Sequence, residues 1–348
     1  MGKIALVLAV FLIVASSAFA AEPRARTEMD TAVDRALEFL QRTQESDGGW
    51  RAGRSKSAAI TGLCVMAFLS AGHVPREGPY GETVEKGVRW VLQAQRANGV
   101  IAVGSGFEMY HHGICALMLA EVAGMTDDKL GAEVRKSLER AVEVILKAQR
   151  SSGAHRGGWR YQVVGFDADI SVTGWQLLAL RASKNLGCDV PPESIDGAVE
   201  FVLRCQDPAT GGFRYQPGIR ETNAARTGTG ILALEICGKE RHRSPEAPKA
   251  GGYLIRHPPR WGEQNFYYAV YYCSQAMFQL GDNYWKFYRP QLHETLLRNQ
   301  SANGSWYGGD FRGREFGPQY GTAMGVLALT VEYRYLPIYQ RDEEPENN

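Results

Sequence analysis

The sequence has almost no net charge and few histidines. Its 348 residues carry 39 basic and 38 acidic side chains, and only 7 are histidine. A protein that binds nucleic acid electrostatically concentrates Lys and Arg on one surface and releases counterions from phosphates. Nothing in so balanced a chain indicates such a surface, and we expect no nucleic-acid partner.

The chain also lacks the paired cysteines of a structural zinc site. None of its six cysteines belongs to a Cys-x-x-Cys pair, and they are spread along the chain as Cys64, Cys115, Cys188, Cys205, Cys237 and Cys273. Most lie in apolar segments, where a thiol packs as a small hydrophobic group. We therefore predict buried free thiols; a disulfide framework is the alternative in an oxidising compartment.

Long apolar runs are absent except at the start. Lys3 precedes an apolar run over residues 4–15, and small residues end at Ala18-Phe19-Ala20, a cleavage site of the A-x-A kind. We interpret residues 1–20 as a signal peptide and predict an exported chain, periplasmic or secreted, with no membrane span after cleavage near Ala20. An uncleaved anchor is the alternative, but the run is short for a bilayer. The acidic residues 340–348 are predicted to be a disordered tail.

The chain does contain a unit that recurs about six times. Its clearest turns run from a Gln through glycine to an aromatic residue, in 44–50, 149–159, 206–213 and 300–306. An amphipathic segment precedes each turn and a more apolar segment follows it, which indicates an outer and an inner helix. The approximate units are 29–73, 82–125, 132–188, 193–238, 246–282 and 284–336. We predict an all-α fold over 21–339, a single alpha/alpha toroid of about six helical hairpins.

The Gln-to-aromatic turns resemble the repeats of squalene and oxidosqualene cyclases and of protein prenyltransferase beta subunits, over nearly the whole chain. The resemblance implies a toroid whose inner helices surround a cavity. The turns themselves are explained as joints: glycine permits the tight backbone, the aromatic ring fills the space between units, and the Gln amide bonds free helix-terminal groups.

The cyclases of this superfamily carry an Asp-x-Asp-Asp motif whose middle acid protonates the substrate. The nearest match is Asp167-Ala-Asp169-Ile170, which implies Asp169 as the acid and Asp167 as its helper. The alternative is that Asp169 is a helix N-cap. Capping is favoured, because aligning the inner helices places it in one column with Ser57, Glu108, Asn223 and Gln264.

The prenyltransferases are similar in fold but hold a catalytic zinc with an Asp-x-Cys pair and a distant His. The matching segment here reads Glu221-Thr-Asn-Ala-Ala225, and the last inner helix begins Tyr320-Gly-Thr-Ala323, so the ligands are missing. His111 and His112 are adjacent and point about 100° apart on a helix. We predict no metal site and no cofactor, with one of these histidines facing the cavity.

The first turns of the inner helices are expected around the mouth of the cavity. Their polar and aromatic side chains are Glu108, Tyr110, His111, Asp167, Asp169, Glu221, Asn223, Arg226, Gln264, Asn265, Tyr267, Tyr268, Gln319 and Tyr320. The favoured function is binding of a small apolar ligand, a peptide or a protein partner in the cavity or on its rim. One alternative is a terpene cyclase that uses Asp169, with tyrosines to stabilise cations. Another is a carbohydrate-active toroid enzyme, which needs two carboxylates.

Overall fold

The computed structural model describes residues 26–103, 106–126, 129–238 and 244–340. The predicted signal peptide and nearly all of the predicted acidic tail lie outside these ranges. Within them the fold is helical, with one two-stranded sheet. The all-α prediction is confirmed.

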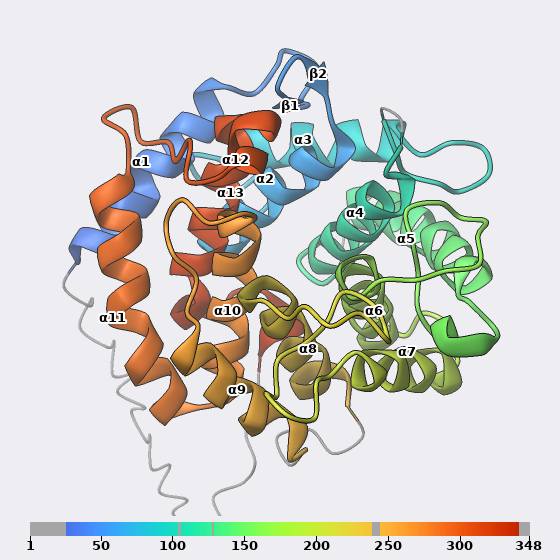
Figure 1. The fold of residues 1–348 in the computed structure, drawn as a ribbon. Helices are drawn as coiled ribbons and strands as arrows, with labels where there is room; N and C mark the ends of the chain where they lie inside the picture. Colours follow the sequence, from blue (N-terminus) through green and yellow to red (C-terminus); the bar gives the residue numbers. More distant parts are fainter. Residues whose placement is uncertain (1–25, 104–105, 127–128, 239–243, 341–348) are drawn as a thin grey trace, which may run out of the picture.

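Six amphipathic helices form the outer ring, which surrounds the molecule in Figure 1. The helix α1 buries one face, including Val33, Leu37 and Leu40, and leaves the other to solvent, as a helix on the outside of a core must. These outer helices are α1 (Glu28–Arg42), α3 (Gly81–Gln93), α5 (Lys129–Ala148), α7 (Pro192–Arg204), α9 (Glu246–Arg256) and α11 (Asp282–Asn299).

Six further helices form the inner ring. All 13 residues of α2 are buried, because other helices surround it on every side. Each inner helix packs against the next, and the last packs against the first. The inner helices are α2 (Ala58–Ser70), α4 (Glu108–Ala123), α6 (Ile170–Asn185), α8 (Ala224–Cys237), α10 (Phe266–Gln279) and α13 (Pro318–Leu329). The predicted toroid of six hairpins is therefore confirmed.

The repeat glutamines join neighbouring hairpins. The Gln44 amide donates to the carbonyl of Gly48 in its own turn and to that of Thr83 in the next outer helix, both at 2.9 Å. Gln300 repeats the pattern on Gly304 at 2.9 Å and on Ala32 at 2.7 Å. Since Ala32 belongs to α1, this last glutamine closes the ring.

Each turn tryptophan is fixed from two sides. The indole Nε1 of Trp306 donates to the Leu296 carbonyl at 2.8 Å, and its backbone amide donates to the Thr322 hydroxyl at 3.0 Å. Equivalent threonines accept from the amides of the other turn aromatics, as Thr227 does from Phe213 at 3.0 Å. A threonine one turn into the inner helix is thus part of the joint.

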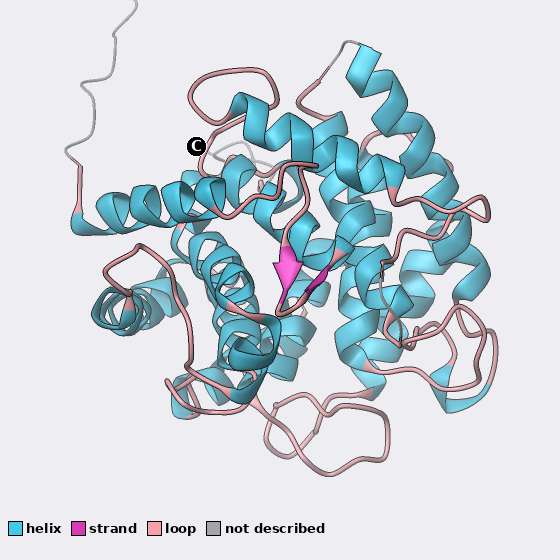
Figure 2. Ribbon diagram, turned by 90° about the horizontal axis from the view of Figure 1, so that it is seen from above, coloured by secondary structure: helices cyan, strands magenta, loops and turns pink. Residues whose placement is uncertain are grey.

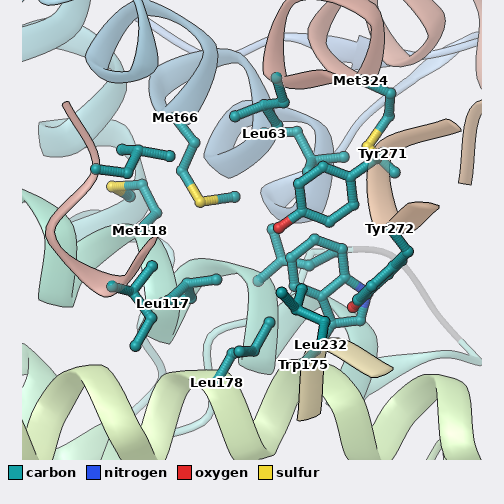
Figure 3. Packing of buried hydrophobic residues seen from close by; sticks show 14 of the residues in the cluster. Leu63, Met66, Leu117, Met118, Trp175, Leu178, Leu232, Tyr271, Tyr272 and Met324 are labelled. Atoms are coloured by element: carbon teal, nitrogen blue, oxygen red, sulfur yellow. The ribbon is translucent and has the colours of Figure 1, made fainter. Parts of the chain in front are cut away.

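Packed side chains fill the interior of the ring beyond the first turns of the inner helices. Figure 3 shows Met66, Met118, Trp175 and Tyr271 among them. At the C-terminal end of α10, the Gln279 amide donates to the Tyr339 carbonyl in η3 (Pro337–Tyr339) at 2.9 Å, and the Tyr339 hydroxyl meets that of Tyr271. The sequence analysis assigned this segment to the toroid without predicting these contacts.

Short strands and helices lie in the segments between the helices of the two rings. Strands β1 (Arg51–Ala52) and β2 (Ser55–Lys56) form an antiparallel hairpin, drawn in magenta in Figure 2. Between α11 and α13 lies the short helix α12 (Phe311–Phe316), and single turns η1 (Gly153–His155) and η2 (Val331–Tyr333) occur elsewhere. The repeat pattern did not predict them. All six cysteines are free, and all but Cys188 are fully buried, so the free-thiol prediction is confirmed.

Candidate functional site

A cavity of about 530 Å³ lies at the N-terminal ends of the inner helices. Its wall includes residues from the first or second turn of every inner helix, so the ring is open at this end, and packed side chains fill its interior beyond the cavity. Several predicted residues lie on this wall: Tyr110, His111, Asn223, Arg226, Gln264, Asn265, Tyr268 and Tyr320.

Six predicted cavity residues do not lie on the wall: Glu108, Asp167, Asp169, Glu221, Tyr267 and Gln319. Tyr267 is fully buried and packs edge-to-face against Trp261, because it points about 100° away from Tyr268 on the same helix. Glu108 is an ion-pair partner of Arg96 at 2.7 Å. Glu221 is exposed in the loop before α8.

The predicted column of capping residues is partly correct. The side chains of Ser57, Asp169 and Asn223 each cap their helix. The α4 helix, however, begins after Phe107, so Glu108 is its first residue instead of its cap. In the fifth unit the residue at the cap position is Asn265, one position after Gln264, and it makes no side-chain capping bond.

Asp169 is buried behind the cavity wall, with both carboxylate oxygens occupied. Oδ1 accepts from the amides of Ser171 at 2.9 Å and Val172 at 3.0 Å, and Oδ2 pairs with Arg160 at 2.9 Å. Burial raises the pKa of this carboxyl, and the Val172 amide and the Arg160 charge oppose that rise. The capping interpretation of Asp169 is confirmed.

Arg160 connects Asp169 to the aromatic wall. Its second carboxylate partner is Asp167, 3.2 Å from Nε. Its guanidinium carbon lies 4.3 Å from the ring centre of Tyr161 and 5.1 Å from that of Tyr215, two wall residues whose hydroxyls are hydrogen-bonded. The two aspartates therefore act on the cavity through an arginine, and neither lies on its wall.

The two adjacent histidines have different roles, as predicted from their spacing. His112 is fully buried: Nδ1 accepts from the Ile101 amide at 3.0 Å, and Nε2 donates to the Ala141 carbonyl at the same distance. It takes the place of the turn threonine in the second unit. His111 lies on the cavity wall, and burial lowers its pKa to about 4. It is therefore neutral at pH 7.

Sequence analysis missed several wall residues. Tyr161 and Tyr215 come from loops, Lys56 from strand β2 and Arg312 from helix α12, where the repeat has no fixed length. Trp175, in the second turn of α6, also lies on the wall and stacks on Tyr271 with ring centres 5.4 Å apart. Helical periodicity could have found Trp175, because it lies on the face of α6 that also carries Ser171.

Several segments before inner helices carry exposed apolar side chains. Val164 and Phe166 are 87% and 90% exposed in the loop before α6. Other exposed apolar residues of these segments are Phe107, Ile219, Tyr307 and Phe311. Phe107 also lies on the cavity wall.

The described residues contain no helix long and apolar enough to cross a bilayer. Among the same residues, no group of three or more His, Cys, Asp or Glu side chains could hold a metal ion.

The two concentric rings and the cavity at one end define an α/α toroid. The sequence model of the prenyltransferase alpha-alpha toroid domain matches residues 3–159 and 168–316. The chain therefore belongs to this family, as the Gln-to-aromatic turns predicted. No curated protein sequence matches it.

Solved structures share the fold at low sequence identity. The α-1,6-mannanase of Salegentibacter sp. HEL1_6 is 12% identical, with a TM-score of 0.67 over 88% of this chain and 99% of that one. The type II terpene cyclase MstE from Scytonema, solved as a variant with its substrate geranylgeranyl dihydroxybenzoate, is 14% identical, with a TM-score of 0.56 over 89% and 98%. Cellobiose 2-epimerase from Bacillus thermoamylovorans is 10% identical, with a TM-score of 0.63 over 87% and 98%. Enzymes of unrelated chemistry thus share this fold.

Proposed function

We propose that this protein is an exported binding protein that holds a small ligand in its central cavity. The cavity at the open end of the ring carries the proposal. Its wall takes residues from every inner helix and combines aromatic rings with polar side chains, among them His111, Asn223 and Arg226. Small ligands bind in concave sites of this kind, where a few polar groups on a largely apolar wall fix their orientation.

The size and the walls of the cavity suit a ligand with an apolar or ring-shaped body. Its volume of about 530 Å³ is typical of small-molecule sites. Tyr110, Tyr161, Tyr268 and Tyr320 present aromatic surface to the cavity, and such rings pack well on apolar and ring-shaped groups.

The distribution of carboxylates favours binding over catalysis. Among the described residues, Glu315 is the one acid on the wall, and it pairs with Arg312. Hydrolysis of a glycoside uses two carboxylates. Protonation by Asp169 would need a carboxylic acid that reaches the substrate, whereas its oxygens bond helix amides and Arg160.

Ligand retention tests the proposal directly. Purified protein is incubated with a small-molecule extract of the source medium, washed, denatured and analysed by mass spectrometry. Ser55→Trp adds bulk on the wall, whereas Arg54→Trp adds it on the same hairpin away from the wall. We expect wild type and Arg54→Trp to retain a common compound that Ser55→Trp loses. Equal retention by all three proteins, or none by any, would refute cavity binding.

The cyclase alternative needs its own assay. The aromatic wall would also suit an isoprenoid, so the protein is incubated with squalene and shorter prenyl substrates, and Asp169→Asn is the comparison. A cyclic product from wild type that the variant fails to make would replace binding by catalysis as the function.

Export is tested by N-terminal sequencing of protein recovered from the culture medium and the periplasm. We expect the mature chain to start near Ala21, because the residues before it resemble a signal peptide. Protein found only in the cytoplasm with its first 20 residues attached would contradict export.

A further inference from the structure

Arg226 is held in a fixed orientation on the cavity wall. It lies in the first turn of α8, where its backbone amide donates to the Asn223 side chain at 2.9 Å. Its Nη1 donates to the Glu221 carbonyl at 3.0 Å, and its guanidinium carbon lies 5.1 Å from the ring centre of Tyr215. These contacts orient the guanidinium group, and none of them neutralises its charge.

Other cations at the cavity are neutralised within the protein. Lys56 pairs with Asp47, and Arg312 pairs with Glu315. Arg160 lies at the same 5.1 Å from the Tyr215 ring centre as Arg226 does. It has two carboxylate partners, Asp167 at 3.2 Å and Asp169 at 2.9 Å.

Arg226 makes no ion pair with any described residue, although it contacts the same tyrosine. A guanidinium group has five N–H donors, and one hydrogen bond to a carbonyl leaves most of them for another partner. An unneutralised charge on a partly enclosed, aromatic wall attracts a counter-charge more strongly than one in open water.

The neighbouring fifth unit supplies two further uncommitted polar groups. Gln264 and Asn265 lie on the wall, and no hydrogen bond of either side-chain amide to a described residue is found. Asn265 occupies the cap position of α10 with φ of 62°, a left-handed conformation, and its side chain does not cap the helix. Asn223 at the same position of α8 does cap its helix. The side-chain amides of Gln264 and Asn265 therefore neither cap the helix nor stabilise the turn before it.

We infer that the ligand of the central cavity carries an oxyanion on an apolar or aromatic body, and that Arg226 binds this oxyanion. The inference rests on the proposed binding function and specifies the class of its ligand. The planar guanidinium fork matches both a carboxylate and a phosphate group. Gln264, in the loop before the adjacent inner helix α10, and Asn265, at its N-cap position, offer amide donors from the same wall.

The test compares three probes with one ring system, 2-naphthoate, 2-naphthyl phosphate and 2-naphthalenemethanol, by isothermal titration calorimetry on the full chain. We expect wild type to bind at least one of the two anions at least tenfold more tightly than the neutral alcohol. The ratio of the two anion affinities distinguishes a carboxylate ligand from a phosphate ligand.

Substitutions of Arg226 test whether this residue binds the anionic group of the probe. Arg226→Gln should remove the preference and leave the alcohol affinity within about twofold, because the aromatic wall is unchanged. Arg226→Lys should keep part of the preference, since it retains the charge but loses the planar fork. Arg220→Gln is the matched control: it removes an exposed arginine of the loop before α8 that is not on the wall, and its binding should equal that of wild type.

Different outcomes separate the two levels of the proposal. Equal affinity for the alcohol and both anions, or an anion preference that survives in Arg226→Gln, would overturn the oxyanion inference and leave the binding function standing. Binding of none of the three probes would count against both. A loss of alcohol binding in Arg226→Gln would also overturn the inference, because the arginine would then support the wall and not select the charge.

Discussion

Asp169 and Arg160 form an ion pair of 2.9 Å in which the carboxylate is fully buried and the guanidinium is partly exposed. The same carboxylate caps α6. Asp169 thus joins the helix to an arginine that stacks on the aromatic wall.

Replacing Asp169 should therefore cost more than replacing an ordinary cap. We expect Asp169→Ala to lower the free energy of unfolding by about 2–3 kcal/mol, because it removes a helix cap and one of the two carboxylates that neutralise Arg160, while Asp167 remains. Asp169→Asn keeps a capping oxygen and should recover about 1 kcal/mol of that loss. Urea denaturation followed by circular dichroism measures both. Asn223→Ala removes only a cap and serves as the control, at about 1 kcal/mol; an equal loss for Asp169→Ala would show that the ion pair contributes nothing.

Gln300 should matter for stability as much as a glutamine in the middle of the chain. Its amide satisfies the Gly304 and Ala32 carbonyls, as that of Gln206 satisfies Gly211 and Glu246. We expect Gln300→Ala and Gln206→Ala each to lower the free energy of unfolding by about 1–3 kcal/mol, because each leaves two carbonyls without this donor. Chemical denaturation of both variants provides the comparison. A far smaller effect at Gln300 would mean that the joint between the last and first units contributes little.

The contribution of the joint threonine can be tested by replacing Thr227 with valine, which has nearly the same shape. Thr227→Val removes the acceptor of the Phe213 amide, whereas Thr227→Ser keeps the hydroxyl. We expect the valine variant to be less stable than the serine variant, and to lose about 1–3 kcal/mol relative to wild type, because a buried amide loses its partner. The midpoints of urea unfolding rank the three proteins. A valine variant as stable as wild type would argue that water replaces the hydroxyl.

These joints could be predicted from the sequence because each unit repeats the same residues at the same spacing. Gln, glycine and an aromatic residue recur, and they predicted the hairpins and the joints between them; the small number of units and the aromatic-rich inner segments predicted closure into a ring. The threonine of the joint was present in the same repeats, at Thr61, Thr173, Thr227 and Thr322, and an alignment of the inner helices contains that signal. His112 hides it in the second unit, where an imidazole replaces the hydroxyl as acceptor.

The site was only partly predictable for a physical reason. In five inner helices the residue three positions after the N-cap faces the cavity, at Ile60, Tyr110, Arg226, Tyr268 and Tyr320. That regularity follows from helix geometry and depends on the correct cap, which the sequence analysis misplaced by one residue in the second and fifth units. Tyr161, Tyr215 and Arg312 come from connections of variable length, so no periodicity indicates where they lie.

Buried Glu121 should make stability depend on pH. Burial raises its pKa to about 8, and the Ile338 amide lowers it only in part. The folded protein then keeps a proton that the unfolded chain has released, so stability falls as pH rises from about 4.5 to about 8. The slope is up to about 1.4 kcal/mol per pH unit.

The window from pH 6.5 to 8 isolates this group from His111 and His112, whose pKa values burial lowers to about 4. Because the pKa values of these histidines are lower in the folded protein than in the unfolded chain, they make stability rise between about pH 4 and 6.5. This is the opposite of the effect of Glu121. Glu121→Gln should therefore abolish the loss of stability between pH 6.5 and 8, as measured by urea denaturation at several pH values. Parallel pH profiles for wild type and variant would show that Glu121 is ionised in the fold.

The closure of the ring by Gln300 and Ala32 also brings distant parts of the chain together. The Tyr333 hydroxyl bonds the carboxylate of Asp30, so the beginning of α1 lies beside the end of the toroid. A short linker could join these two ends, and new N- and C-termini could then be placed between any two hairpins. The order in which the six units are translated is therefore separable from the architecture that they form, and a circularly permuted chain should build the same cavity.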